Sequence, residues 1–338
     1  MLRFKQIVLS LSIVSSLCCT GALQAAEFAK PVIEIADADE LKGITKVAVT
    51  SFTVQYVTEQ VWDTTHYSQG YLQTSGQGGG FSTGKSLDPA KLQATTDAVY
   101  QEFMKNLKST GLEVDSPEQL AASEAYKTFL SKGPKTPRVE EAEAQSGNGA
   151  GAITSVFYTP SGMTMAIDDH MDYLKTAMMS VVSDPTLTFS GRLGLYMTNL
   201  PYYDKDVQKE LGAATLHVRV YIPLAKVDVK TGTMIYGQGY SKQAIEPGLR
   251  LGERFTRVAV GKDGDYARMY LKEPLLIPNV VDSKIVELDH PNVVRAMMGE
   301  KIKTYPATLN VENYWKIMPE AVNYTLKEFA VKLKENIR

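Results

Sequence analysis

The feature that most constrains the fold is residues 45–57, an apolar and β-branched run without Gly or Pro. Such a run predicts a β-strand, because β-branched and aromatic side chains pack well on a pleated surface. Alternation would place Val47 and Val49 on one face, and the other face would carry Ala48, Phe52, Val54 and Tyr56. Apolar side chains on both faces predict a central strand that is covered on both sides.

The chain after this strand predicts a helix, a second strand and a second helix, ending near residue 130. Asp88 and Pro89 indicate a helix start, because Asp accepts hydrogen bonds from free N–H groups and Pro fits the first helical position. Gly111 is suited to end this helix, whose apolar face consists of Leu92, Val99, Phe103 and Leu107. A short strand over 111–115 and a capping box over 116–119 follow. This order predicts an α/β fold, a mixed β-sheet flanked by helices.

An additional antiparallel β hairpin region is predicted over residues 213–242, where apolar and polar residues alternate. Within it, the sequence predicts a tight turn over residues 230–233, followed by an antiparallel strand over 234–240. Another hairpin is expected over 255–271. A last amphipathic helix is expected over 319–335, where apolar residues recur at helical spacing.

Residues 1–26 have the pattern of a cleavable signal peptide. Arg3 and Lys5 form a basic start, and residues 7–17 form an apolar core that is too short to span a bilayer. Small residues over 22–26 favour cleavage at the end of this segment. We therefore expect a periplasmic or secreted protein.

Both cysteines of the chain, Cys18 and Cys19, lie in this segment. A lipoprotein signal needs a small residue before the acceptor cysteine, whereas Leu17 precedes Cys18. We therefore expect cleavage without lipidation. The mature chain would then have no disulfide, no thiolate nucleophile and no cysteine metal site.

Residues 27–338 are expected to form a single α/β domain with long insertions at 58–87 and 132–205. The insertions contain two low-complexity stretches: residues 66–85 are rich in Gly, and residues 132–151 are rich in Gly, Pro and Glu. Such compositions predict a loop and an exposed excursion rather than core.

Charge excludes some classes of partner. The net charge is −2, with 36 basic and 38 acidic residues well mixed along the chain. The absence of a basic stripe argues against nucleic-acid binding. No apolar run after residue 26 is long enough for a membrane-spanning helix.

Two local signatures carry a resemblance to a known family. The first is KVAVTSF, starting at Lys46, followed after a helix by GLEVDSPEQL, starting at Gly111. The second is GAATLHV, starting at Gly212, followed by VDVKTGTMI, starting at Val227. With the last amphipathic helix, these resemble bacterial envelope proteins built on the fold of the curli-secretion lipoprotein and the TolB amino-terminal domain.

The resemblance covers residues 44–131, 205–245 and 310–338. It implies a role in envelope assembly or binding, and it implies no catalytic residues. We also expect no cofactor. The chain departs from the family in its two insertions and in lacking a suitable lipid-acceptor cysteine, so the secretion-pore function is not carried over. Peripheral association with the outer membrane stays open.

A candidate metal site is the cluster Asp168, Asp169, His170 and Asp172. On a helix, residues three or four apart share a face, so these carboxylates and the imidazole suit a divalent cation. The alternative is a helix start stabilised by acidic residues, with nearby methionines filling the core. His217 lies in a predicted strand, so we interpret it as a structural residue rather than a metal ligand.

Ser82 lies in a stretch that matches two catalytic patterns. Residues 80–84 have the Gly-x-Ser-x-Gly spacing of a hydrolase nucleophile, and residues 79–86 have the spacing of a phosphate loop. Both motifs require a strand that passes directly into a helix, whereas the predicted helix starts only after Asp88. We therefore expect chance matches in a Gly-rich stretch.

The leading hypothesis is an exported, non-enzymatic envelope protein that acts in assembly or partner binding. Its partner would be another envelope protein or a second copy of the chain. The alternative is a periplasmic carrier of a small apolar or metal ligand, and the third hypothesis is a serine hydrolase using Ser82.

Overall fold

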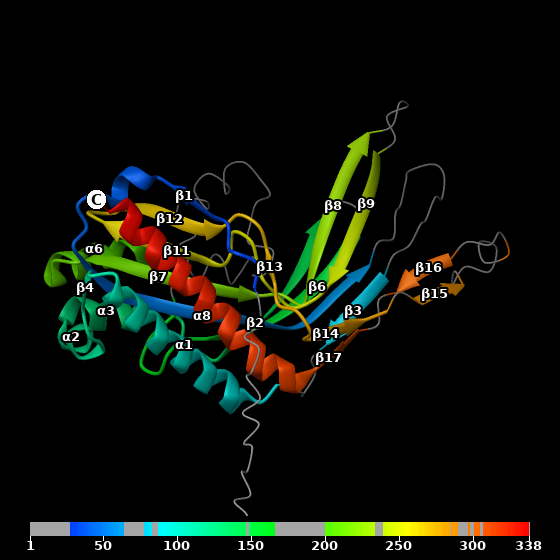
Figure 1. Ribbon diagram of the computed structural model, residues 1–338, viewed down its shortest axis with the longest axis horizontal. Coiled ribbons are helices and arrows are strands. Elements are labelled where there is room, and N and C mark those ends of the chain that lie inside the picture. The colour runs from blue at the N-terminus through cyan, green and yellow to red at the C-terminus, as the bar shows by residue number, and fades with distance from the viewer. Residues whose placement is uncertain are drawn as a thin grey trace, which may run out of the picture.

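The computed structural model describes residues 28–63, 78–82, 87–146, 149–165, 200–233, 239–284, 286–289, 297, 301–304 and 307–337. In these residues the fold is mixed α/β, with one main sheet of parallel and antiparallel strands and several small antiparallel sheets (Figure 1). The predicted fold class is therefore confirmed, including the additional antiparallel hairpins.

The main sheet has nine strands, and its centre is β2 (Lys46–Asp63). Parallel pairing joins β2 to β7 (Ala214–Ile222) and to β4 (Glu113–Val114), and antiparallel pairing joins it to β3 (Gly78–Ser82). The spatial order is β1 (Ile33–Ala36), β12 (Asp265–Leu271), β11 (Arg257–Lys262), β7, β2, β6 (Gly149–Tyr158) and β5 (Arg138–Ser146).

Strand β2 is covered on both sides as predicted, but its apolar residues are distributed differently. The register with β7 shifts between Val49 and Ser51, so Thr50 is an extra residue in β2. The bulge puts Val49 and Phe52 into one hydrophobic cluster, whereas Ala48 packs in the other cluster. The predicted division of faces was therefore wrong, because a one-residue bulge reverses the alternation beyond it.

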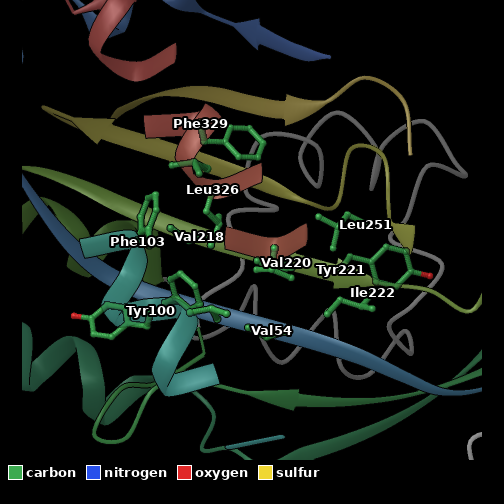
Figure 2. Packing of buried hydrophobic residues seen from close by; sticks show 14 of the residues in the cluster. Val54, Tyr100, Phe103, Val218, Val220, Tyr221, Ile222, Leu251, Leu326 and Phe329 are labelled. Carbon is green, nitrogen blue, oxygen red and sulfur yellow. The ribbon is translucent and has the colours of Figure 1, made fainter. Parts of the chain in front are cut away.

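Two long helices, α1 (Pro89–Ser109) and α8 (Val311–Asn336), lie side by side across one face of the sheet (Figure 1). Figure 2 shows Phe103 of α1 and Phe329 of α8 directed at the same core as Val218 of β7. The predicted capping of α1 is confirmed, since the Asp88 carboxylate accepts a hydrogen bond from the Ala90 N–H at 2.9 Å. Burial of this face is the main apolar contribution to stability in the described residues.

The opposite face is covered in part by α3 (Glu124–Lys132) and α6 (Leu200–Leu211). Two short helices occur earlier in the chain, η1 (Ala38–Leu41) and α2 (Pro117–Ala122). A second hydrophobic cluster forms there between the helices and the sheet, consisting of Ala48, Leu120, Tyr126, Phe129, Val207 and Ala213. Two covered faces explain why β2 and β7 are apolar along so much of their length.

Several two-stranded sheets lie outside the main sheet. The longest is β8 (Ala225–Thr233) with β9 (Gly239–Pro247), which projects away from the helices in Figure 1. The others are β15 (Val286–Asp289) with β16 (Lys301–Thr304), β14 (Val281–Ser283) with β17 (Ala307–Leu309), and β10 (Arg250–Leu251) with β13 (Leu275–Leu276).

The hairpin β8–β9 differs from the predicted one. Residues 230–233, predicted as a turn, continue strand β8, and Thr231 pairs with Ser241. The strand is longer than expected because the backbone pairing of β9 extends through the Thr-Gly-Thr sequence, whose composition alone favours a turn.

Three other boundaries also differ. Residues 78–82 of the predicted loop form β3, because glycines do not prevent backbone pairing to the long β2. The predicted excursion over 132–151 contains β5 and the start of β6. The last helix begins at Val311 rather than residue 319, because the Asn310 side chain accepts a hydrogen bond from the Asn313 N–H and caps it.

The predicted signal segment over 1–26 lies outside the described residues. In the part of the chain that the structure describes, no helix combines the length and apolar character needed to cross a membrane.

Candidate functional site

A pocket of about 510 Å³ lies where β2 and β7 begin. Its walls come from the residues just before and at the start of these two strands, from helix α6 and from the turn between β11 and β12. Four of its lining residues are lysines, and only one is acidic: Lys46, Lys205, Lys209, Lys262 and Asp263. We call this cavity the lysine pocket.

Lys46 is held in place at the wall between β2 and α6. Its Nζ atom lies 2.9 Å from the Asp115 carboxylate and donates a hydrogen bond to the Leu211 carbonyl at 2.9 Å. Asp115 is 1% exposed, so this ion pair is screened less than a surface pair. Glu113, a further 3.8 Å contact of Lys46, is largely exposed. Most of the charge of Lys46 is therefore compensated.

Lys262 is also anchored, because its Nζ atom donates a hydrogen bond to the Lys42 carbonyl at 2.9 Å. A carbonyl is a neutral acceptor, so this bond fixes the position of the ammonium group without cancelling its charge. The following turn is Asp263–Gly264, and both residues have positive φ, 55° and 95°. That backbone is the two-residue turn predicted by an Asp-Gly pair between alternating strands.

Lys205 and Lys209 stand on one face of α6, four residues apart, and both are exposed. The described part of the chain supplies no hydrogen-bond or ion-pair partner for either ammonium group. The Lys205 side chain lies over Gly264, where an added Cβ would overlap its Cε atom. The stem of Lys205 therefore packs across this turn at the pocket wall.

A buried polar network lies behind the pocket and centres on Asp204. Its carboxylate is fully buried and contacts the His217 ring nitrogen at 3.1 Å. It accepts hydrogen bonds from the Tyr266 hydroxyl at 2.7 Å and from the Gln208 amide at 3.0 Å, and also from the Thr215 hydroxyl. This set of donors satisfies a carboxylate that burial would otherwise strongly destabilise.

The electrostatics of Asp204 follow from these contacts. Burial by itself raises the pKa of the carboxyl group, but the charge and hydrogen bond of His217 and the hydroxyls of Thr215 and Tyr266 lower it. The net result is a pKa below the ordinary value, so Asp204 is ionised at neutral pH. The network connects α6 to β7 and β12 behind the pocket.

Gln208 connects the network to the pocket, because it lines the cavity and its Nε2 atom donates to both Asp204 and Thr215. Gly261 of β11 leaves room for this amide. A Cβ atom at Gly261 would lie 2.7 Å from Gln208 Nε2 and 2.8 Å from Thr215 Oγ1. The position of Gln208 therefore depends on the absence of a side chain at 261.

The residues predicted as a metal site, Asp168, Asp169, His170 and Asp172, lie outside the described residues. Among the residues that are described, no group of three or more His, Cys, Asp or Glu side chains could hold a metal ion. Ser82 is the last residue of β3, and α1 begins only at Pro89. His217 is buried against Phe129 and Tyr266 in edge-on ring contacts, which fits its structural interpretation.

Sequence reasoning missed the lysine pocket and the Asp204 network. A helical projection of residues 204–211 would have shown one signal: Asp204 and Gln208 share one face, and Lys205 and Lys209 share the adjacent one. The contributions of Lys46 and Lys262 had no local signal, because strand pairing brings them to α6 from distant parts of the chain.

Comparisons with known proteins do not assign the chain to a family. Searches found no matching protein-family model, no matching curated protein and no matching solved structure. The site is therefore interpreted from its own geometry, a cavity whose excess of ammonium groups suits an anionic ligand.

Proposed function

We propose that this chain is an exported, non-enzymatic envelope protein that assembles with further copies of itself through its projecting β-hairpins. The observation that carries the proposal is the hairpin β8–β9. Its pairing runs from Ala225 with Pro247 to Thr233 with Gly239, and it forms a two-stranded sheet separate from the main sheet. In Figure 1 it stands away from the α/β layers.

Physical chemistry favours an intermolecular role for such a hairpin. A two-stranded hairpin without further support is marginally stable in water, and among the described strands no third strand pairs with either edge of β8–β9. Adding a strand from another molecule supplies main-chain hydrogen bonds along the whole edge. The hairpin β15–β16 is a second two-stranded sheet, with pairing from Val286–Thr304 to Asp289–Lys301, and its strand β16 lies against β3 of the main sheet.

The signal-peptide pattern over 1–26 supports export, and the resemblance to envelope proteins supports an assembly role. The alternative, a periplasmic carrier of an apolar or metal ligand, has less support from the described residues. The lysine pocket is cationic rather than apolar. The candidate metal ligands at 168–172 lie in the part of the chain that is not described, so the metal hypothesis stays a prediction.

The proposal can be tested by shortening the hairpin at a defined pair. Residues 227–245 are replaced by Asn-Gly, so that Lys226 and Glu246, which are cross-strand partners, flank a two-residue turn. Native mass spectrometry should show an oligomer for the intact protein and a monomer for the shortened one. Thermal unfolding should be similar for both, because the hairpin contributes no strand to the main sheet.

Two results would count against the proposal. A monomeric intact protein at micromolar concentration would contradict self-assembly. An oligomer that survives shortening would show that another surface makes the contact. A matched control is the replacement of the exposed pair Lys105 and Glu102 of α1 by Gln, which leaves all strands intact.

A further inference from the structure

We propose that the lysine pocket is a binding site for a phosphate monoester, a ligand that the assembly role does not require. The site is independent of the hairpins: it lies where β7 begins at Ala214, whereas the hairpin β8–β9 follows the other end of β7 at Ile222. Three observations support this site: the charge of the lining, the volume of the cavity, and two lysines, Lys205 and Lys209, for which the described residues supply no partner.

The charge of the pocket matches a dianion. Lys46 is compensated by Asp115, and Asp263 offsets one of the three other lysines. The lining therefore carries an excess of about two positive charges, and a phosphate monoester carries about −1.5 to −2 charge at pH 7. A carboxylate, with one negative charge, would leave part of this excess uncompensated.

The ammonium groups of Lys205 and Lys209 repel each other, and a bound anion would offset this repulsion. Two like charges four residues apart on a helix repel each other, which destabilises an isolated helix by a few tenths of a kcal/mol. Lys209 lies in the last turn of α6, where the helix dipole favours a cation, but Lys205 lies one turn earlier. An anion between them would attract both ammonium groups.

The other two lysines of the lining, Lys46 and Lys262, are held in position by the protein before any ligand binds. Lys262 is fixed by the carbonyl of Lys42, and Lys46 is fixed by Asp115 and the end of α6. A ligand would therefore need to order only the two lysines of α6, which limits the entropy lost on binding. Ammonium groups act as point charges with several donors each, which suits phosphate oxygens.

The cavity is large enough for an organic group besides the phosphate. Its volume of about 510 Å³ falls within the range of small-molecule sites, about 300–1,000 Å³. Beside the lysines, Ile44 contributes an apolar side chain to the lining, and Gly212 leaves space because it has no side chain. Two sources share this chemistry: a soluble phosphate ester, or the phosphate-monoester headgroup of a lipid.

The test uses the purified full chain and two probes. Titration calorimetry measures binding of glycerol 3-phosphate, and co-sedimentation measures binding to phosphatidylcholine vesicles with and without phosphatidic acid. The double variant Lys205→Gln/Lys209→Gln removes the two ammonium groups for which the described residues supply no partner. The matched control, Lys316→Gln/Lys327→Gln, removes two exposed helical lysines of α8 that lie outside the pocket lining.

Binding of either probe should weaken at least tenfold in the Lys205→Gln/Lys209→Gln variant and less than twofold in the control. Binding of glycerol 3-phosphate would identify a soluble ester as the ligand class, and binding of phosphatidic acid vesicles alone would identify a lipid headgroup. Binding of neither probe, or equal weakening in the two double variants, would overturn the proposal. Neither outcome bears on the hairpin assembly, which is measured separately.

Discussion

The carboxylate of Asp204 lies 3.1 Å from the ring nitrogen of His217, and the two side chains are 0% and 3% exposed. They join α6 to β7, the strand beside β2, in the interior of the protein. Removing one partner of such a buried pair is costly, because the remaining polar groups lose their partner without regaining water. Asp204 therefore provides a direct test of what holds α6 at the lysine pocket.

Asp204→Asn should lower the free energy of unfolding at about pH 7 by about 3–5 kcal/mol. The pKa of Asp204 is lower in the folded protein than its ordinary value of 3.8, so its contribution is complete above that value. It is lost as the pH falls through the folded-state pKa, where the carboxylate protonates in both states. Urea unfolding at about pH 7 and about pH 3 should show the difference between wild type and variant shrinking in acid.

The control for this prediction is Asp206→Asn in the same helix, which changes an exposed carboxylate. It should change the free energy of unfolding by less than about 0.5 kcal/mol. Equal losses for Asp204→Asn and Asp206→Asn would mean that the buried network contributes no more than a surface charge.

Phe103→Ala should lower the free energy of unfolding by about 3–5 kcal/mol, because it leaves a cavity between α1 and the sheet. The Phe103 side chain is 1% exposed and its ring centroid lies 6.0 Å from that of Phe52 in β2. Lys105→Ala, in the same helix, should cost less than about 0.5 kcal/mol, because its ion pair with Glu102 is exposed. Chemical denaturation of both variants measures the contrast, and similar losses would refute the packing of α1.

Tyr126→Phe tests the contact between α3 and the bulge in β2. The Tyr126 hydroxyl donates a hydrogen bond of 3.1 Å to the carbonyl of Thr50, the extra residue of the bulge, and both residues are buried. Phe has no hydroxyl to donate, so the buried Thr50 carbonyl loses this hydrogen bond. The free energy of unfolding should therefore fall by about 1–3 kcal/mol. Thermal and urea unfolding check it.

Tyr324→Phe in α8 is the matched control, because the described residues supply no hydrogen-bond partner for its hydroxyl. It should leave the stability nearly unchanged. A loss in Tyr324→Phe as large as that in Tyr126→Phe would show that the bulge does not depend on the hydroxyl.

Gly261→Ala tests the packing behind the lysine pocket. The added methyl group would meet Gln208 Nε2 at 2.7 Å and Thr215 Oγ1 at 2.8 Å, both closer than ordinary contact. Overpacking of this kind costs about 1–3 kcal/mol. A fall in Tm together with weaker glycerol 3-phosphate binding is expected, and an unchanged Tm would contradict the close packing at this position.

Elements whose signals are local could be predicted from the amino-acid sequence. Asp88 caps α1 as expected, and Ser116 with Gln119 forms the expected capping box of α2. The Asp263–Gly264 turn lies within the predicted hairpin. These features depend on residues within a few positions of each other, so propensity, capping and turn chemistry are sufficient to specify them.

Features that depend on strand pairing could not be predicted from local sequence. The bulge at Thr50 exists only in the register of β2 against β7, and it reversed the predicted faces of half the strand. The extent of β8 likewise depends on its pairing with β9 rather than on the Thr-Gly-Thr sequence. Pairing energy acts between residues far apart in the chain, so local composition does not report it.

The lysine pocket shows the same division most clearly. Lys205 and Lys209 could have been placed on one helical face from their spacing alone. Their meeting with Lys46 and Lys262 required parallel pairing of β2 with β7 and antiparallel pairing of β7 with β11. A site assembled by such pairings has no contiguous motif, because the distances that define it are set by the sheet rather than by the chain.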